Sequence, residues 1–189
     1  MAGRPTRYAA LLRGVNVGGN KKIAMADLRA LLTGLGFDDV STLLQSGNAV
    51  FTAPKTDPGQ IAGRIEQALA DDLGLRSRVL LRSHPELAAV IAANPFPTAA
   101  EEPSKHLVQF LFAPLTELSR ARIAEFDARA FEPEEFRVGD GVIYFRFPNG
   151  IGQSKLSVAF GKHVTAKFEM TGRNWNTVRK LHDLTDING

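Results

Sequence analysis

The chain has 189 residues, of which 44% are hydrophobic and 23% are charged, as in folded globular proteins and unlike disordered ones. It contains no cysteine, which excludes disulfide bonds, thiolate zinc sites and cysteine nucleophiles. No apolar run approaches the roughly 18 residues of a membrane span, and the first residues lack the apolar core of a secretory signal. We therefore expect a cytoplasmic protein with a small net charge of +3 that does not bind membranes.

The first half of the chain alternates strand and helix patterns. Short apolar runs bounded by turn residues predict strands, and apolar residues at helical spacing predict helices. Gly36 and Gly74 are expected to end the two helices. The predicted elements are strand 8–12, helix 25–35, strands 40–45 and 49–53 around a tight turn at 46–48, helix 61–73 and strand 79–81. That order is βαββαβ, the ferredoxin-like arrangement.

A helix near residues 86–93 and a proline-rich stretch lead into the second half. Because proline fixes φ and removes a backbone donor, the stretch 95–104 is expected to be a semi-rigid linker. The element order then begins again. The predicted elements are strand 107–112, helix 115–126, a hairpin of strands 135–138 and 142–147, helix 154–160, a strand at 165–168 and helix 173–184.

These patterns predict an α+β protein made of two ferredoxin-like subdomains, packed into one compact unit and followed by a C-terminal helix. We assign residues 1–94 to the first subdomain, residues 95–104 to the linker, and residues 105–189 to the second subdomain with the C-terminal helix. The two halves repeat each other in the order of their elements and not in their residues.

Four loop segments hold more glycine, amide, hydroxyl and basic residues than turns alone require. Two of them join a strand to a helix, where glycine lets backbone N–H groups converge on an anion and the helix N-terminus adds partial positive charge. The same residues also fit ordinary turns and capped helix starts. The four segments are residues 13–22, 45–48, 149–156 and 171–177.

Known cofactor motifs do not fit these segments. The glycines of segment 13–22 lack the G-x-G-x-x-G spacing, and Asn20 stands where a P-loop has its phosphate-binding lysine. The four histidines show no zinc-binding spacing, and acidic pairs such as Glu134-Glu135 are expected to be solvated turns. We therefore expect no cofactor and no metal, and no residue stands out as catalytic.

Hydrogen-bond donors dominate all four segments and acids are scarce, which favours a small anionic ligand that carries phosphate or carboxylate groups. The first 22 residues contain five basic residues and no acidic one, although an ordinarily solvated surface explains that charge equally well. The candidate ligand-binding residues are Arg13, Asn16, Asn20, Ser154, Lys155 and Arg173.

Two other functions stay open at this stage. In one, the polar segments hold the two halves together, and the protein is a structural or protein-interaction module. In the other, the strand with Tyr144, Phe145 and Phe147 binds single-stranded nucleic acid. That strand does not match the RNP1 pattern, and Phe145 and Phe147 are expected in the core because they share one face. The sequence does not indicate an oligomeric state.

The motifs of these segments resemble those of one bacterial family, catalogued as domain of unknown function 1697. The similarity covers about residues 7–184 and rests on four stretches. They are residues 13–22, Gln45-Ser46-Gly47-Asn48 before Val50-Phe51, Pro148-Asn149-Gly150-Ile151-Gly152 with Ser154-Lys155-Leu156, and residues 173–178. The resemblance implies an α+β fold of two ferredoxin-like subdomains, and it implies no activity.

Overall fold

The computed structural model describes residues 5–16, 22–164 and 168–187. The chain divides into two compact units, Met1–Ala89 with Lys180–Gly189, and Val90–Arg179. This division places the boundary after residue 89, where the prediction ended the first subdomain at residue 94, and it also assigns the last ten residues to the first unit instead of the second.

Side-chain contacts explain why the C-terminal segment belongs to the first unit. Arg7, near the start of the chain, donates from Nε to the carbonyl oxygen of Leu184 at 2.7 Å. The rings of His84 and His182 are stacked with their centroids 4.2 Å apart, and Nδ1 of His84 lies 3.0 Å from the carbonyl oxygen of His182. Nothing in the periodicity of the last helix indicates these long-range contacts.

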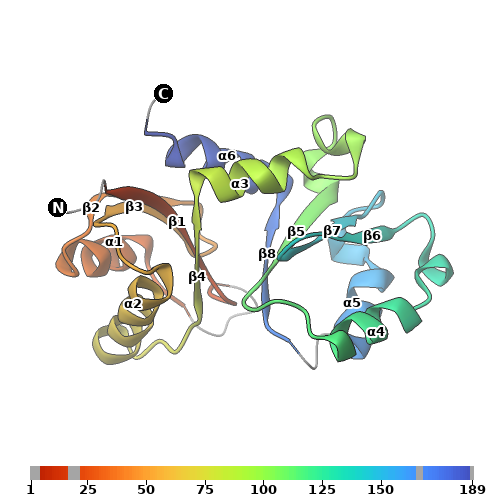
Figure 1. Cartoon of the computed structure of the whole chain (residues 1–189), viewed down its shortest axis with the longest axis horizontal. Helices are drawn as coiled ribbons and strands as arrows, with labels where there is room; N and C mark the ends of the chain where they lie inside the picture. Colours follow the sequence, from red (N-terminus) through yellow and green to blue (C-terminus); the bar gives the residue numbers. More distant parts are fainter. Residues whose placement is uncertain (1–4, 17–21, 165–167, 188–189) are drawn as a thin grey trace. The chain divides into compact units, whose positions relative to one another are not determined.

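The first unit contains a four-stranded antiparallel sheet in the order β2-β3-β1-β4. Helices α1 and α2 cover one face of this sheet (Figure 1). Asp57 caps α2 by accepting a hydrogen bond from the backbone N–H of Gln60, and Gly74 ends it with a φ of 60°, as predicted. The elements are β1 (Thr6–Leu12), α1 (Met25–Gly34), β2 (Asp38–Leu43), β3 (Asn48–Ala53), α2 (Pro58–Leu73) and β4 (Val79–Ser83).

Side chains of β1 are buried on both faces of the sheet. Ala10 and Leu12 belong to the core between the sheet and its two helices, together with Phe51 of β3. Ala9 and Leu11 point to the opposite face and are also fully buried. A strand buried on both faces has a continuous apolar sequence rather than an alternating one, which is the pattern that predicted it.

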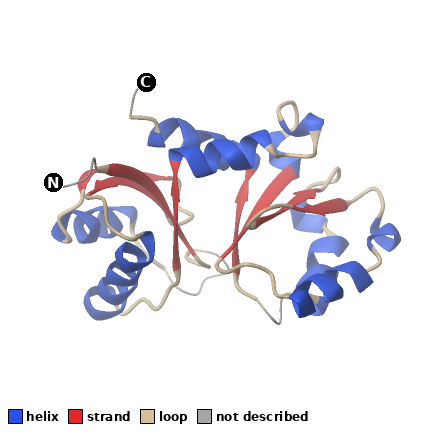
Figure 2. Cartoon of the chain, in the orientation of Figure 1, coloured by secondary structure: helices blue, strands red, loops and turns tan. Residues whose placement is uncertain are grey.

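The second unit repeats this topology with the strand order β6-β7-β5-β8 (Figure 2). Its helices α4 and α5 cover one face of the sheet, and short 3₁₀ helices connect the larger elements. The remaining elements are α3 (His84–Ala92), η1 (Pro97–Ala99), η2 (Pro103–Lys105), β5 (His106–Leu111), α4 (Glu117–Glu125), η3 (Ala128–Phe131), β6 (Glu135–Val138), β7 (Val142–Arg146), η4 (Ile151–Gln153), α5 (Lys155–His163), β8 (Met170–Asn174) and α6 (Trp175–Thr185).

Aromatic packing dominates the core of the second unit. The ring of Phe160 in α5 lies edge-on against Phe145 at 5.1 Å and against Phe136 at 4.8 Å between centroids. Such edge-to-face pairs are a preferred geometry of aromatic rings. The burial of Phe145 and Phe147 confirms that these residues belong to the core.

The structure confirms the predicted α+β class and the two ferredoxin-like arrangements, each followed by a helix. The proline-rich stretch lies within the second unit, where it forms η1 and η2 and buries Phe96 and Ala99. The repeated order, βαββαβα, extends through α3 in the first half and α6 in the second.

The prediction for the end of the chain is wrong at one point. Residues 173 and 174 were expected to begin the last helix, but they form the end of strand β8, which pairs with β5. The helix starts two residues later, at Trp175, because Asn174 caps it, accepting a 2.9 Å hydrogen bond from the backbone N–H of Thr177. The strand predicted at 165–168 falls mostly on residues outside those described.

Candidate functional site

The six residues expected to bind a ligand are divided between the two units. Arg13 and Asn16 belong to the first unit, whereas Ser154, Lys155 and Arg173 belong to the second. The sixth, Asn20, lies outside the described residues. The hydrogen bonds and the burial of each described side chain indicate whether its role is structural or whether it can bind a ligand.

The side chain of Asn16 holds the ends of a loop together. Its Nδ2 donates to the carbonyl oxygens of Ile23 at 2.9 Å and of Gln45 at 2.6 Å, and its Oδ1 accepts from the backbone N–H of Ile23 at 3.0 Å. Asn16 also adopts a φ of 55°, a left-handed conformation that asparagine tolerates better than most residues. These contacts use both ends of the amide, so the structure gives Asn16 a role in shaping the loop.

The segment 45–48 forms a tight turn whose polar groups bond to each other. Asn48 is fully buried, and its Nδ2 donates to the carbonyl oxygen of Leu43 at 3.1 Å and to Oγ of Ser46 at 2.9 Å. The carbonyl oxygen of Gly47 accepts from the backbone N–H of Leu12 at 2.9 Å. This turn therefore fixes the end of the β2–β3 hairpin against the end of β1.

The N-terminus of α5 already holds a carboxylate from the protein itself. Glu134 is only 9% exposed, and its Oε2 accepts from Oγ of Ser154 and from the backbone N–H of Leu156, both at 2.8 Å. Oγ of Ser154 also caps the helix by accepting from the backbone N–H of Ser157 at 2.8 Å. The expectation that Glu134 lies in a solvated turn is therefore wrong, since its carboxylate satisfies helix donors that need a partner.

Arg173 lies on the opposite face of the second sheet from α5. It pairs with Val108 on β5, which pairs in turn with Tyr144 on β7, whereas the neighbouring Phe145 packs against α5. Because side chains alternate along a strand, the sheet separates Arg173 from Ser154. The structure therefore does not bring these two candidate residues together.

The guanidinium of Arg173 is buried, with 6% of the residue exposed. Its Nη1 donates to Oγ1 of Thr171 at 2.9 Å and to the carbonyl oxygen of Gly172 at 2.7 Å. Burial lowers the pKa of Arg173 to about 10, because desolvation disfavours the charged form. Lys155, at the first turn of α5, is exposed instead.

A pocket in the first unit brings Arg13 together with two arginines that the sequence analysis did not single out. Its volume is about 560 Å³, and we call it the arginine pocket. One side is formed by the residue that follows β1 and by the residues that precede β4. The other side is formed by α2. The lining residues are Arg13, Gly63, Glu66, Gln67, Ala70, Asp71, Arg76, Ser77 and Arg78.

Strand pairing explains why these distant residues meet. Leu12 of β1 pairs with Val79 of β4, so Arg13 lies beside Arg78, and its backbone N–H donates to the carbonyl oxygen of Arg78 at 2.9 Å. Oγ of Ser77 adds a 3.0 Å hydrogen bond to the carbonyl oxygen of Arg13. These contacts therefore fix the two lining segments of this wall, and the arginine side chains extend from a rigid frame.

The helical wall of the pocket follows the periodicity of α2. Residues 63, 66, 67, 70 and 71 recur at helical spacing and therefore share one face of the helix. Two of them, Gly63 and Ala70, have little or no side chain, and a Cβ built at Gly63 would meet no atom within 4 Å. These small residues leave space along this wall.

Arginines outnumber acidic residues in the lining of the pocket by three to two. Oε1 of Glu66 accepts from Nε of Arg78 at 3.2 Å and from the backbone N–H of Val79 at 2.8 Å. Oδ2 of Asp71 accepts from Nε2 of Gln67 at 2.7 Å. Arg76 forms no hydrogen bond or ion pair with any residue that the structure describes. The formal charge of the lining, with three arginines, one glutamate and one aspartate, is therefore +1.

A second pocket, of about 420 Å³ in the other unit, has balanced charges. Glu135 bridges two arginines there, with Oε2 3.0 Å from Nη2 of Arg137 and Oε1 3.2 Å from Nη1 of Arg146. The lining also includes Arg129 and the acids Glu132 and Glu134. Equal numbers of arginines and glutamates make this pocket a weaker candidate for an anion.

The aromatic residues of β7 do not form a surface on which bases could stack. Tyr144, Phe145 and Phe147 are each at most 3% exposed. The hydroxyl of Tyr144 donates to the carbonyl oxygen of Val90 at 2.8 Å. The nucleic-acid hypothesis therefore loses the feature that motivated it, since stacking needs accessible ring faces.

We expect the phenol of Tyr144 to titrate near pH 12, because burial raises its pKa to about 12. The unfolded chain loses this proton near its ordinary pKa of about 10. The stabilising contribution is therefore fully present below pH 10 and is lost as the pH rises from 10 to 12. The difference in ultraviolet absorbance between the wild type and Tyr144→Phe isolates this titration, and a midpoint near 10 would contradict the buried position.

Two features are absent from the described part of the chain. No group of three or more histidine or acidic residues is placed to hold a metal ion among residues 5–16, 22–164 and 168–187. None of the helices described is both long and apolar enough to cross a membrane.

Comparison with known proteins identifies the family but no activity. No curated protein matches the chain. Among solved structures, the conserved bacterial protein SP0830 from Streptococcus pneumoniae has a similar fold, with a TM-score of 0.73 and 26% identity over 97% of this chain and all of that one. A family model described as "Protein of unknown function (DUF1697)" matches residues 6–144. That match covers more than half of the sequence, and the chain therefore belongs to the DUF1697 family.

Proposed function

We propose that the protein binds a small anionic ligand in the arginine pocket. The observation that carries this proposal is the convergence of Arg13, Arg76 and Arg78 on one pocket of about 560 Å³, a size within the range of small-molecule sites. A guanidinium presents several N–H donors in one plane and matches phosphate and carboxylate oxygens. Arg13 was also predicted from the sequence as a ligand-binding residue, and it lines this pocket.

The other described residues that the sequence predicted as ligand contacts do not line the arginine pocket. The side chain of Asn16 bonds to the backbone of Ile23. The hydroxyl of Ser154 bonds to the carboxylate of Glu134 and caps α5. These contacts favour a structural role for both residues. Lys155 and Arg173 belong to the other unit. A structural or interaction role for those polar segments is compatible with an anion site in the arginine pocket.

The affinity expected for a simple anion is modest. A hydrogen bond to a charged group contributes about 1.5–3 kcal/mol, and association itself costs about 4 kcal/mol or more. Three arginine contacts of about 3 kcal/mol each therefore leave about 5 kcal/mol, which corresponds to a dissociation constant of roughly 0.2 mM, and weaker contacts give millimolar values. Inorganic phosphate is a suitable probe because its size and charge match the core of the proposed ligand.

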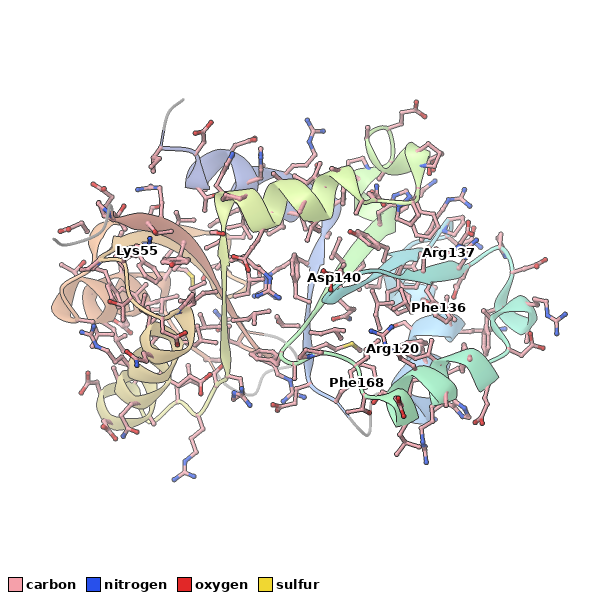
Figure 3. The ribbon with its side chains drawn as sticks, viewed as in Figure 1. Lys55, Arg120, Phe136, Arg137, Asp140 and Phe168 are labelled. Carbon is pink, nitrogen blue, oxygen red and sulfur yellow. The ribbon has the colours of Figure 1, made fainter. Side chains whose placement is uncertain are left out.

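Arg76→Ala is expected to weaken phosphate binding by about tenfold or more, since one charged contact of at least about 1.5 kcal/mol is lost. The melting temperature should stay unchanged, because Arg76 has no hydrogen-bond or ion-pair partner among the described residues. Isothermal titration calorimetry with phosphate measures the change. Arg120→Ala is the matched control, because Arg120 is an exposed arginine on α4 of the second unit (Figure 3). Equal loss in both variants, or no binding by the wild type, would refute the proposal.

Gly63→Leu is expected to abolish the same binding by filling the pocket from its helical wall. A side chain at this position enters open space, so the helix should tolerate it and gain about 0.5–1 kcal/mol from the loss of glycine. Gly34→Leu is the matched control, because Gly34 is also helical and has open space around its Cβ position but does not line the pocket. Thermal unfolding and phosphate titration of both variants separate occlusion of the pocket from a change in stability.

A further inference from the structure

The arginine pocket carries carboxylates as well as arginines, and their placement restricts which anions suit it. Glu66 and Asp71 stand on the α2 wall, whereas Arg13, Arg76 and Arg78 stand on the opposite wall. A ligand that only carries negative charge would meet repulsion from the α2 wall. A ligand with a positive group at one end would interact favourably with both walls.

The two carboxylates differ in what they offer a ligand. Oε1 of Glu66 already accepts from Nε of Arg78 and from the backbone N–H of Val79, so it is committed to holding β4 and α2 together. Asp71 is exposed, and in the part of the chain that the structure describes its only partner is Gln67, which donates to Oδ2. That bond, one helical turn away, restrains the carboxylate while leaving Oδ1 to accept another donor.

We infer that the arginine pocket selects zwitterionic ligands, in which a phosphate or carboxylate lies a few bonds from an ammonium group. The arginine wall binds the anionic end, and Asp71 accepts hydrogen bonds from the ammonium. The space along Gly63 and Ala70 accommodates the carbon atoms between the two charged ends. This inference rests on the proposed function, because it assigns the ligand class for the same pocket.

A pair of probes that differ only in the ammonium group tests the inference. O-phosphoethanolamine and ethyl phosphate share the phosphate and the two-carbon chain, and inorganic phosphate reports on the arginine wall alone. We expect the wild type to bind O-phosphoethanolamine about threefold to fivefold more tightly than ethyl phosphate, which is the upper part of the range for an exposed pair of opposite charges. Asp71→Asn should remove this preference while preserving or improving the binding of inorganic phosphate.

Asp72→Asn provides the matched control, because Asp72 is an exposed neighbour on the same helix that does not line the pocket. This variant changes the net charge by the same amount and should keep the preference. Equal affinity of the wild type for the two organic probes overturns the inference while leaving anion binding intact. Failure of all three probes to bind overturns the proposed function itself. A preference that survives in Asp71→Asn also refutes the role of Asp71.

Discussion

Gly47→Ala is expected to lower the free energy of unfolding by about 2–5 kcal/mol. Gly47 adopts a φ of 71°, which costs an L residue about 1–2 kcal/mol. A Cβ there would lie 2.1 Å from Cγ2 of Val15 and 3.0 Å from Cβ of Leu12, both of which are buried. Forcing extra atoms into a packed site adds about 1–3 kcal/mol.

Gly14→Ala separates the two causes. Gly14 has a similar φ of 66°, but a Cβ at this position would meet no atom within 4 Å. This variant should therefore lose only about 1–2 kcal/mol, the cost of the backbone conformation. Chemical denaturation of both variants gives the comparison. Similar losses in the two would mean that Val15 and Leu12 do not pack against the turn as the structure shows.

Glu134→Ala is expected to destabilise the second unit by about 3 kcal/mol. The substitution removes the acceptor of two hydrogen bonds and leaves the hydroxyl of Ser154 and the N–H of Leu156 buried without it. Hydrogen bonds to a charged group contribute about 1.5–3 kcal/mol each, and unsatisfied buried donors add to the loss. The N-terminal end of α5 should unfold more readily, which hydrogen exchange at its first turn measures.

A graded series checks this assignment. Glu134→Gln keeps an oxygen acceptor but removes the charge, so it should lose about 1 kcal/mol, clearly less than Glu134→Ala. Glu125→Ala, at an exposed position of α4, should change the free energy of unfolding by no more than about 0.5 kcal/mol. If Glu134→Ala were as mild as Glu125→Ala, the carboxylate would not be satisfying the N-terminus of α5.

The order of the elements could be predicted from the sequence because each strand and helix has a local apolar pattern. The same reasoning fails for β8, whose sequence Met-Thr-Gly-Arg-Asn has neither an apolar run nor β-branched alternation. It forms a strand because β5 supplies pairing partners along its length. Tertiary pairing thus overrides local propensity at Arg173.

The candidate site could be predicted only in part, because it depends on pairing between distant segments. Arg13 was identified from its glycine-rich loop, whereas Arg76 and Arg78 lie in a segment with no motif. A signal was nevertheless present: basic residues alternate with buried Leu75, Ser77 and Val79 just before a strand. In a ferredoxin-like order β1 pairs with β4, so the residue after β1 is expected beside those before β4.

The burial of Glu134 could not be read from its neighbours in the sequence. Its two partners lie 20 and 22 positions away, at the start of α5. An adjacent pair of glutamates after a proline looks like a solvated turn from composition alone. The glycine-rich segment before α5 correctly indicated a helix N-terminus suited to an anion, but the anion is a side chain of the protein.

The binding of an anion by the arginine pocket is tested most directly by nuclear magnetic resonance of the wild type during titration with inorganic phosphate. Backbone amide and arginine Nε–H signals report on each residue separately. We expect saturable shifts that cluster at Arg13, Gly63 and residues 76–78, the residues that line the pocket. Saturable shifts confined to Lys155 and Arg173 in the other unit, or no saturable shift at all, would contradict the account.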